Sequence, residues 1–232
     1  MISGLAATRL IASVTLRRLI RGRALWVGGI VAALPIAFAA LLHEHHAKVA
    51  STIFDVTNFE TLILAVLPAL FVASSIGEEI EDRTTTYLWS RPIPRSAVLL
   101  GKLAALVPVI VLLVLTSWFL AIEVGARVMP SAASFGGMAV GALALSMVAA
   151  AIATLVPKHG MALTICYMLF IDLPVGALPA SLRELSVTHH VRVISDLLGR
   201  TEESAAMATL GCFLIGAFWL AIGLLRIRRL EA

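Results

Sequence analysis

The sequence has little charge. Asp, Glu, Lys and Arg make up 14% of its 232 residues, whereas 60% are hydrophobic. A soluble domain of this length is usually about half apolar and about a quarter charged. Several apolar runs approach the ~20 residues that a spanning helix needs, so lipid is the expected solvent. The net charge of +4 does not indicate a nucleic-acid partner, because the arginines stand at the ends of the apolar runs, where they anchor helices in a membrane.

The sequence is also poor in cysteine and has no internal repeat or low-complexity tract. Cys166 and Cys212 both fall inside apolar runs, which is typical of buried free thiols and argues against a disulfide. No segment has the composition of a soluble domain, so residues 1–232 are expected to form a single transmembrane domain. The first apolar run is long enough to span and is followed by no small-residue cleavage site, so no removable signal peptide is expected.

A nucleotide-binding P-loop is absent as well. The pattern G-x-x-x-x-G-K-[ST] cradles ATP phosphates, but Gly101-Lys102 lacks the upstream glycine and is followed by Leu103. The chain is therefore not expected to be an ATPase, and no catalytic residue or cofactor is predicted in it.

What the sequence does contain is six long apolar runs. All should be helices, because lipid offers the backbone no hydrogen-bond partner. The expected fold is an all-α integral membrane protein with six transmembrane helices. Their expected positions are Ala24–Leu42, Thr61–Gly77, Leu103–Ile122, Phe135–Val156, Met161–Ala180 and Met207–Leu225.

The positive charges predict the orientation. With the N-terminus in the cytoplasm, thirteen Lys and Arg residues fall on the inner side and five on the outer side, which satisfies the positive-inside rule. The expected protein is a multi-pass protein of a plasma (inner) membrane with both termini cytoplasmic.

Residues 1–23 are expected to form an amphipathic helix on the inner leaflet. On a helical wheel Ala12, Leu16, Leu19 and Ile20 gather on one side. Arginines on the other side would face water and anionic headgroups. The alternative is a first span that begins early with a basic flank. The arginines expected to anchor this helix are Arg17, Arg18, Arg21 and Arg23.

A charged segment, residues 78–102, separates the second and third spans. Its eight charged residues would cost on the order of 20 kcal/mol at mid-bilayer by simple addition, so the segment must lie in water or against another protein. Acidic residues open it, as is favourable at a helix start, and Pro92 would end that helix. Tyr87, Leu88 and Trp89 are large apolar groups that would mark a protein contact, or alternatively anchor the segment at the headgroup level.

The charged segment resembles the permease subunits of ABC-2 type transporters. The resemblance rests on Glu79-Ile-Glu81-Asp82-Arg83-Thr84, Tyr87-Leu88, Ser90-Arg91-Pro92-Ile93-Pro94-Arg95 and Leu99-Leu100-Gly101-Lys102, together with the six spans and the basic start. Many members have glycine in place of Arg83 and glutamate in place of Thr86.

The resemblance implies a coupling helix within residues 78–102 that docks into a separate ATP-binding subunit. It implies two copies of this ABC ATPase, with ATP and Mg bound there, and a second permease copy as homodimer or related heterodimer. In this layout residues 24–77 hold spans one and two, and residues 103–232 hold spans three to six with an outer loop at 181–206. The residues expected at the ATPase interface are Glu78, Glu79, Glu81, Asp82, Arg83, Tyr87, Leu88, Trp89, Arg91 and Arg95.

Two outer loops are expected, at 43–60 and 181–206. The second has Leu182, Leu185 and Ile194 at roughly helical spacing, which predicts a short helix on the outer rim. Pro174 and Pro179 suggest that the outer half of the fifth span is broken or re-entrant.

Polar residues inside spans are candidates for a translocation path. Asp172 lies in the fifth span, where an ionisable residue is a functional candidate by default, and Thr116 and Ser117 lie in the third. The outer histidines are candidates for a shared metal site, although His43-Glu44-His45-His46-Ala47 is not H-E-x-x-H. The preferred interpretation of these histidines is a polar membrane surface. The outer histidines are His43, His45, His46, His189 and His190.

The expected function is that of the membrane subunit of an ABC exporter. One alternative is an ATPase-driven assembly or mechanotransmission factor that acts on an outer accessory protein. Another is a metal-related intramembrane protein that uses the outer histidines.

Overall fold

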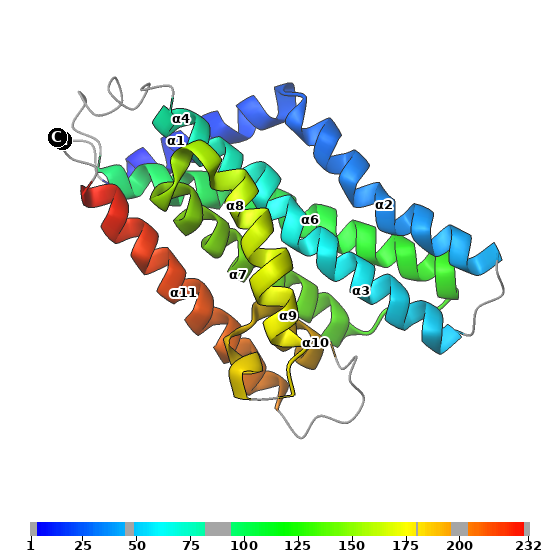
Figure 1. Cartoon of the computed structure of the whole chain (residues 1–232). Coiled ribbons are helices and arrows are strands. Elements are labelled where there is room, and N and C mark those ends of the chain that lie inside the picture. Colours follow the sequence, from blue (N-terminus) through cyan, green and yellow to red (C-terminus); the bar gives the residue numbers. More distant parts are fainter. Residues whose placement is uncertain (1–3, 45–48, 82–93, 180, 196–203, 230–232) are drawn as a thin grey trace.

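The computed structural model describes residues 4–44, 49–81, 94–179, 181–195 and 204–229, and every regular element in these ranges is a helix (Figure 1). The longer elements are α1 (Gly4–Arg21), α2 (Ala24–Glu44), α3 (Val49–Pro68), α4 (Ser74–Glu81), α6 (Arg95–Ala126), α7 (Ala132–Leu155), α8 (Gly160–Tyr167), α10 (Val187–Ile194) and α11 (Ala205–Arg229). The short ones are η1 (Ala69–Ala73), η2 (Pro157–His159), η3 (Met168–Asp172), α9 (Leu173–Gly176) and η4 (Ser181–Leu185).

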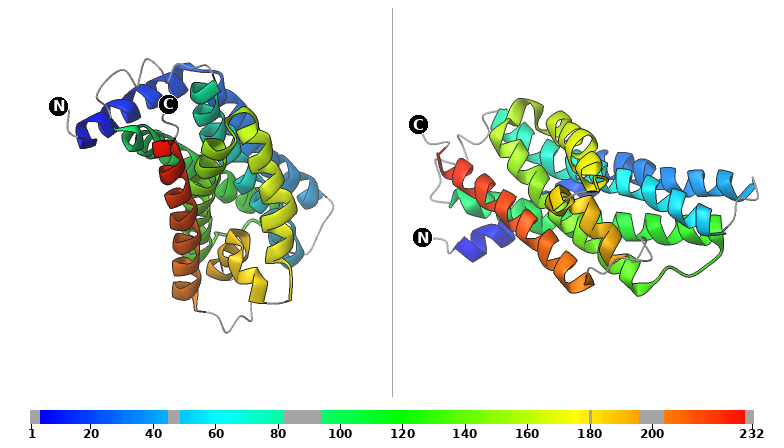
Figure 2. Two further views of the ribbon diagram at one scale, coloured as in Figure 1. Left: turned by 60° about the vertical axis from the view of Figure 1, so that its left-hand side comes forward. Right: turned by 60° about the horizontal axis from the view of Figure 1, so that its bottom comes forward.

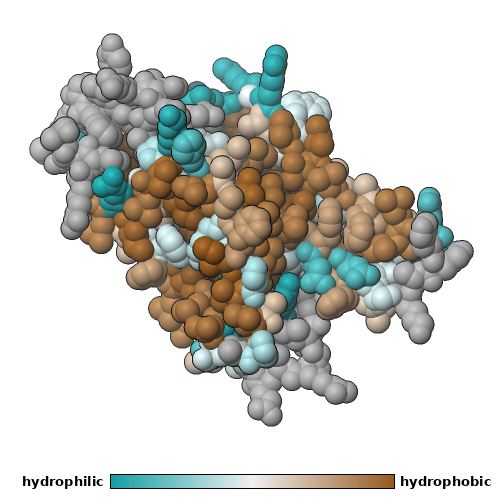
Figure 3. Space-filling model, viewed as in Figure 1, coloured by the Kyte–Doolittle hydropathy of each residue, from teal (hydrophilic) through white to brown (hydrophobic). Residues whose placement is uncertain are grey.

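In the part of the chain that the structure describes, six helices are long and apolar enough to cross a membrane, as the apolar runs predict. Apart from shifts at their ends, five coincide with the expected spans. The six are Ala24–Glu44, Val49–Gly77, Arg95–Ala126, Ala132–Leu155, Pro157–Gly176 and Ala205–Ile227. Hydrophobic residues cover much of the described surface in the view of Figure 3, with smaller groups of hydrophilic residues between them and at the margins. Such an apolar surface is expected of a protein in contact with lipid.

Both chain termini lie at the same end of the molecule (Figure 2). The start of α6 lies at this end too, because a Cβ on Gly4 would lie 4.0 Å from Pro94. Helix α4 is joined to α6 there by the hydrogen bond from Lys102 to Ser75. We call it the terminal end. The opposite end carries α10 and is called the α10 end.

Helix α7 is the centre of the bundle, and small residues let its neighbours approach closely. A Cβ on Gly216 of α11 would lie 3.3 Å from the Cα of Ala144, and a Cβ on Gly223 would lie 3.2 Å from the Cα of Ala151. Without a hydrophobic driving force between helices in lipid, such close contact is a main source of association. The small residues of the fourth span therefore pack helices, as the sequence indicates.

The second span begins earlier than the sequence predicts. Residues 43–60 are expected as an outer loop, but α3 is helical from Val49, so the expectation is wrong. The polar residues of this stretch point into the bundle: Thr52, Thr57 and Glu60 are all buried. A hydropathy pattern counts polar residues against a span whichever way they face, and these face protein.

Two spans contain a π-helical turn. In the second, Pro68 cannot donate a backbone hydrogen bond, and the turn η1 follows it directly before α4 continues the helix. In the fifth, η3 joins α8 to α9 without a break. The expectation of a broken or re-entrant outer half is therefore wrong: the span is helical to Gly176, and Pro179 lies beyond it.

The short helix α10 packs between α7, α9 and α11. Glycines of three different helices make room for it. A Cβ on Gly137 would lie 2.2 Å from Ser195 Oγ, one on Gly176 would lie 2.6 Å from Ser186 Oγ, and one on Gly211 would lie 2.5 Å from His190 Nε2. The rim helix expected in residues 181–206 therefore exists, but it is buried in the bundle.

The leucines expected on the rim helix are not its packing residues. Leu182 and Leu185 lie in η4 and are exposed, whereas Val187, Val191 and Ile194 of α10 are buried. Helix α10 begins directly after Ser186, whose side chain caps it by accepting the backbone N–H of His189.

Candidate functional site

The charged segment leaves the bundle at the terminal end. Helix α4 carries Glu78, Glu79 and Glu81 in its last turn, so the expectation that these acids begin a helix is wrong; α6 begins at Arg95. The chain between them lies outside the described residues. The interface candidates in that part are Asp82, Arg83, Tyr87, Leu88, Trp89 and Arg91.

Lys102 ties the two flanks of the charged segment together. Its side chain is buried, and its ammonium group donates hydrogen bonds to the backbone carbonyl of Ser75 and, at 3.1 Å, to Ser75 Oγ. Hydrogen bonds from a charged donor are stronger than neutral ones, and more so away from water. The start of α6 is thereby fastened to the start of α4, 27 residues earlier in the chain.

Two glycines allow further close helix contacts beside Lys102. A Cβ on Gly101 would lie 2.8 Å from the carbonyl oxygen of Thr8, so only glycine lets α1 pack on α6 here. A Cβ on Gly77 would lie 2.7 Å from the carbonyl oxygen of Pro157, so α4 packs on the turn between the fourth and fifth spans. The Gly101-Lys102 pair of the sequence pattern thus joins α1, α4 and α6 in one contact region.

Helix α1 exists where the basic start predicts it, but it packs through a different face. Ala7 and Leu19 are buried, whereas Leu16 and Ile20 are exposed and available to lipid. Packing on α6 selects one stripe of the helix, and a helical wheel cannot tell that stripe from the lipid-facing one. All four arginines expected to anchor α1 are exposed: Arg17, Arg18, Arg21 and Arg23.

Asp172 holds α10 in place. Its carboxylate accepts the backbone N–H groups of Val187 at 2.8 Å and Thr188 at 3.0 Å, and its own carbonyl accepts the hydroxyl of Ser186 at 2.9 Å. The first N–H groups of a helix lack partners within it, and a carboxylate satisfies them well. The contacts of Asp172 are those of a helix cap supplied by a neighbouring helix.

The two polar residues of the third span differ in their surroundings. Thr116 is exposed, and its hydroxyl bonds to carbonyls of its own helix. Ser117 is buried and donates a hydrogen bond to Glu60 Oε2 at 2.9 Å. Glu60 itself is 0% exposed, and its Oε1 has no hydrogen-bond partner among the described residues. Because a carboxyl group is costly inside a membrane, this pair is a functional candidate.

Residues 16–181 match the family described as ABC-2 family transporter protein. The match covers more than half of the chain. The chain belongs to the ABC-2 transporter family. No individual curated protein matches it.

Membership in the ABC-2 family gives the molecule its general role. It is a multi-pass membrane protein and a permease of an ABC transporter, the transmembrane subunit that is not itself an ATPase. An ABC ATPase is the partner that this implies. The matched range includes the whole charged segment and the Asp172 region.

The histidines of this ABC-2 permease do not converge on a metal site in the part that the structure describes, where no group of three potential ligands occurs. His43 Nδ1 lies 3.2 Å from the carbonyl of Gly125. His190 Nε2 lies 2.9 Å from the carbonyl of Glu184, so it is the protonated nitrogen. The ring of His189 lies beside that of His190, with the centroids 5.6 Å apart and the planes tilted by 54°. His45 and His46 lie outside the described residues.

Sequence reasoning about the permease missed Glu60 because it placed this residue at the end of an outer loop. A signal was available. Thr57, Glu60 and Thr61 follow helical spacing, which indicates a polar stripe on a helix that starts upstream of the apolar run. The burial of Lys102 had no signal in the sequence, because its partners are the backbone carbonyl and the hydroxyl of a serine 27 residues away.

Proposed function

We propose that this chain is the membrane-spanning subunit of an ABC exporter and that residues 78–102 are its coupling segment. The observation that supports the proposal is the set of contacts at the two ends of this segment. Its two flanks are fastened to each other by Lys102 and to α1 through Gly101. A force applied to the segment would therefore be transmitted to the second and third spans together.

The terminal end is cytoplasmic in this proposal, and ATP and Mg are bound by the partner ATPase. Closure of two ATPase copies would push the charged segments of two permease copies and rock their spans. Helices α2 and α11 expose large apolar residues such as Trp26, Ile30 and Phe218, which suits contact with lipid or with the second permease copy. The family implies the ATPase partner, whereas the second permease copy and the two ATPase copies are part of the proposal.

The test is co-purification of the ATPase with variants of the charged segment. E81Q, Y87A and R91Q should each weaken ATPase association or uncouple its turnover from transport, because each removes a charge or an anchor at the proposed interface. E123Q is the matched control, since Glu123 is an exposed acid at the α10 end of α6. The ATPase should co-purify with E123Q as with the unaltered chain.

Transport in proteoliposomes then separates export from mechanical work on an outer partner. Unchanged ATPase association and unchanged coupling in all three charged-segment variants would contradict the proposal. Association without any ATP-dependent flux of any tested cargo would favour the mechanical role.

A further inference from the structure

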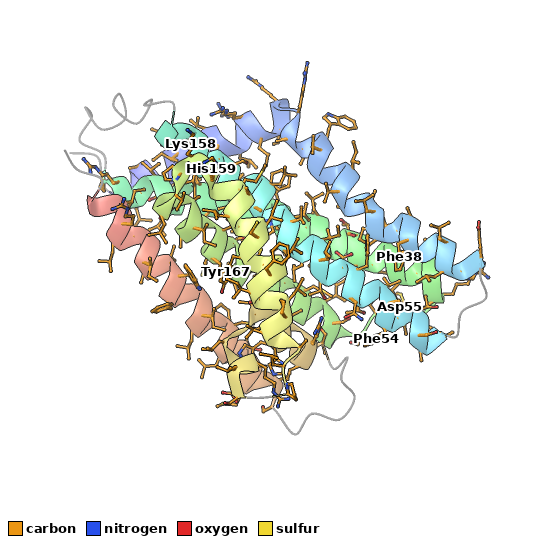
Figure 4. All side chains as sticks on the ribbon, viewed as in Figure 1. Phe38, Phe54, Asp55, Lys158, His159 and Tyr167 are labelled. Atoms are coloured by element: carbon orange, nitrogen blue, oxygen red, sulfur yellow. The ribbon has the colours of Figure 1, made fainter. Side chains whose placement is uncertain are left out.

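A cavity of about 400 Å³ opens at the α10 end, between α3, α9, η4 and α10. Figure 4 labels Phe54, one of its wall residues, at this end of α3. The polar groups of its lining are Thr57, Asn58, Arg183, His189 and Arg192, and no acidic residue is among the lining residues that the structure describes. The cavity is thus bordered by two guanidinium groups and has a basic lining.

Arg192 is incompletely compensated by its protein partners. It donates one long hydrogen bond of 3.4 Å to Asn58 Oδ1, while its Nε is buried and has no acceptor among the described residues. Burial lowers the pKa of Arg192, and the nearby charge of Asp172 opposes this effect. Arg192 as a whole is only half-buried and lines the cavity, so its guanidinium gains from an anion within reach.

Asp172 is not free to serve as that anion. Each of its carboxylate oxygens already accepts a backbone N–H group, from Val187 and from Thr188. These bonds direct the carboxylate at the start of α10. Asp172 therefore interacts with Arg192 only by long-range charge attraction, and Arg192 Nε still has no hydrogen-bond acceptor among the described residues.

We propose that this cavity binds a single anionic group of the phosphate-ester type, held by Arg192 and Arg183. Guanidinium groups suit phosphate because their planar donors match its oxygens. The rim formed by Phe54, Leu178 and Pro179 is exposed and apolar, so it suits the hydrocarbon part of an amphiphile beside the headgroup. A lipid headgroup and a free phosphate share this chemistry. The site goes beyond the proposed export function, since it requires neither ATP nor the ATPase.

The experiment uses the full chain in nanodiscs and two probes. In the first arm, inorganic phosphate is titrated into nanodiscs of phosphatidylcholine, and binding is measured by calorimetry. In the second arm, nanodiscs contain phosphatidylglycerol as well, and native mass spectrometry measures its retention on the released protein. Saturable binding of either probe supports the site, and the arm in which it occurs identifies the source of the phosphate.

Substitutions link the binding to the cavity. R192Q and R183Q should each weaken the binding of the effective probe about tenfold, the loss expected for one charge-assisted hydrogen-bonded contact. R127Q is the control, because Arg127 is an exposed arginine at the end of α6 and does not line the cavity. It removes the same charge and should bind as the unaltered chain does.

Two results would overturn the proposal. One is the absence of saturable binding in both arms. The other is equal weakening in R127Q and the cavity variants, which would mean that only the overall charge matters. If R192Q does not fold, R183Q tests the proposal on its own. Arg183 lies in the short helix η4, which has no buried residues, so its substitution should leave the bundle folded.

Discussion

At the scale of single residues, Asp172 shows how a carboxylate inside a span can serve the architecture. The sequence alone makes it a candidate for the translocation path, because an ionisable residue is costly in lipid. Its observed bonds to the start of α10 supply another sufficient reason for its presence. Its contacts within the described residues favour a role in positioning α10.

Replacing Asp172 should loosen α10. D172A removes both carboxylate acceptors and should lower the free energy of unfolding by about 2 kcal/mol, while D172N keeps one acceptor oxygen and should lose about half as much. Hydrogen exchange should accelerate at the amides of Val187 and Thr188, which lose their partner.

The matched control for Asp172 is D55N, because Asp55 lies at the same end of the molecule on α3 (Figure 4). Exchange at Val187 and Thr188 should be unchanged in D55N. Unchanged exchange in D172A as well would contradict the capping role.

The pair of Glu60 and Ser117 makes a second residue-scale prediction. S117A removes the one hydrogen bond that the described residues provide to Glu60, and it should destabilise the protein by about 1 kcal/mol in an SDS unfolding titration. In an E60L background the same substitution should cost much less, because the acceptor is gone. T116A, next to Ser117 but facing outward, is the control and should be nearly neutral.

At the scale of elements, the docking of α10 depends on a backbone approach that only glycine allows. Gly136 and Gly137 are neighbours on α7, yet a Cβ on Gly137 would meet Ser195 and Val191, and a Cβ on Gly136 would meet nothing within 4 Å. G137A should therefore displace α10 and lower stability by 1 kcal/mol or more, by the overpacking range of about 1–3 kcal/mol.

The neighbouring substitution G136A should be neutral or slightly stabilising, because alanine is the better helix former. Thermal unfolding of the two variants in one detergent compares them directly. Equal melting temperatures would contradict the tight contact between α7 and α10.

The sequence predicts that the six spanning helices exist, but it does not predict where each of them begins and ends. Apolar runs predict all six spans because lipid requires about 20 apolar residues and full backbone hydrogen bonding. The same pattern misplaces the start of α3 by twelve residues, since Thr52, Thr57 and Glu60 face protein rather than lipid. It also predicts a helix near α10 and correctly includes Ile194 among its packing residues, but Leu182 and Leu185 lie outside this helix and are exposed.

At the scale of the whole molecule, one end gathers the flanks of the proposed coupling segment and the elements packed on them. The charged segment's flanks, α1 and the turn between the fourth and fifth spans contact one another there, and Lys158 and His159 lie at this end in Figure 4. The cavity with Arg192 lies at the opposite end. Charge counts in the sequence place residues 78–102 and Arg192 on opposite sides. They give no sign of the bonds of Lys102 and Asp172, which join these side chains mainly to backbone groups.

The orientation that follows can be tested with single cysteines in a chain whose Cys166 and Cys212 are first replaced by serine. In intact cells, S90C and K158C should be protected from a membrane-impermeant maleimide, and R127C should react, because the excess of positive charge keeps the terminal end in the cytoplasm. After permeabilisation, S90C and K158C should become reactive, which controls for burial. Reaction of S90C in intact cells would contradict this orientation, because it would place the charged segment outside the cell, where no cytoplasmic ATPase can bind it.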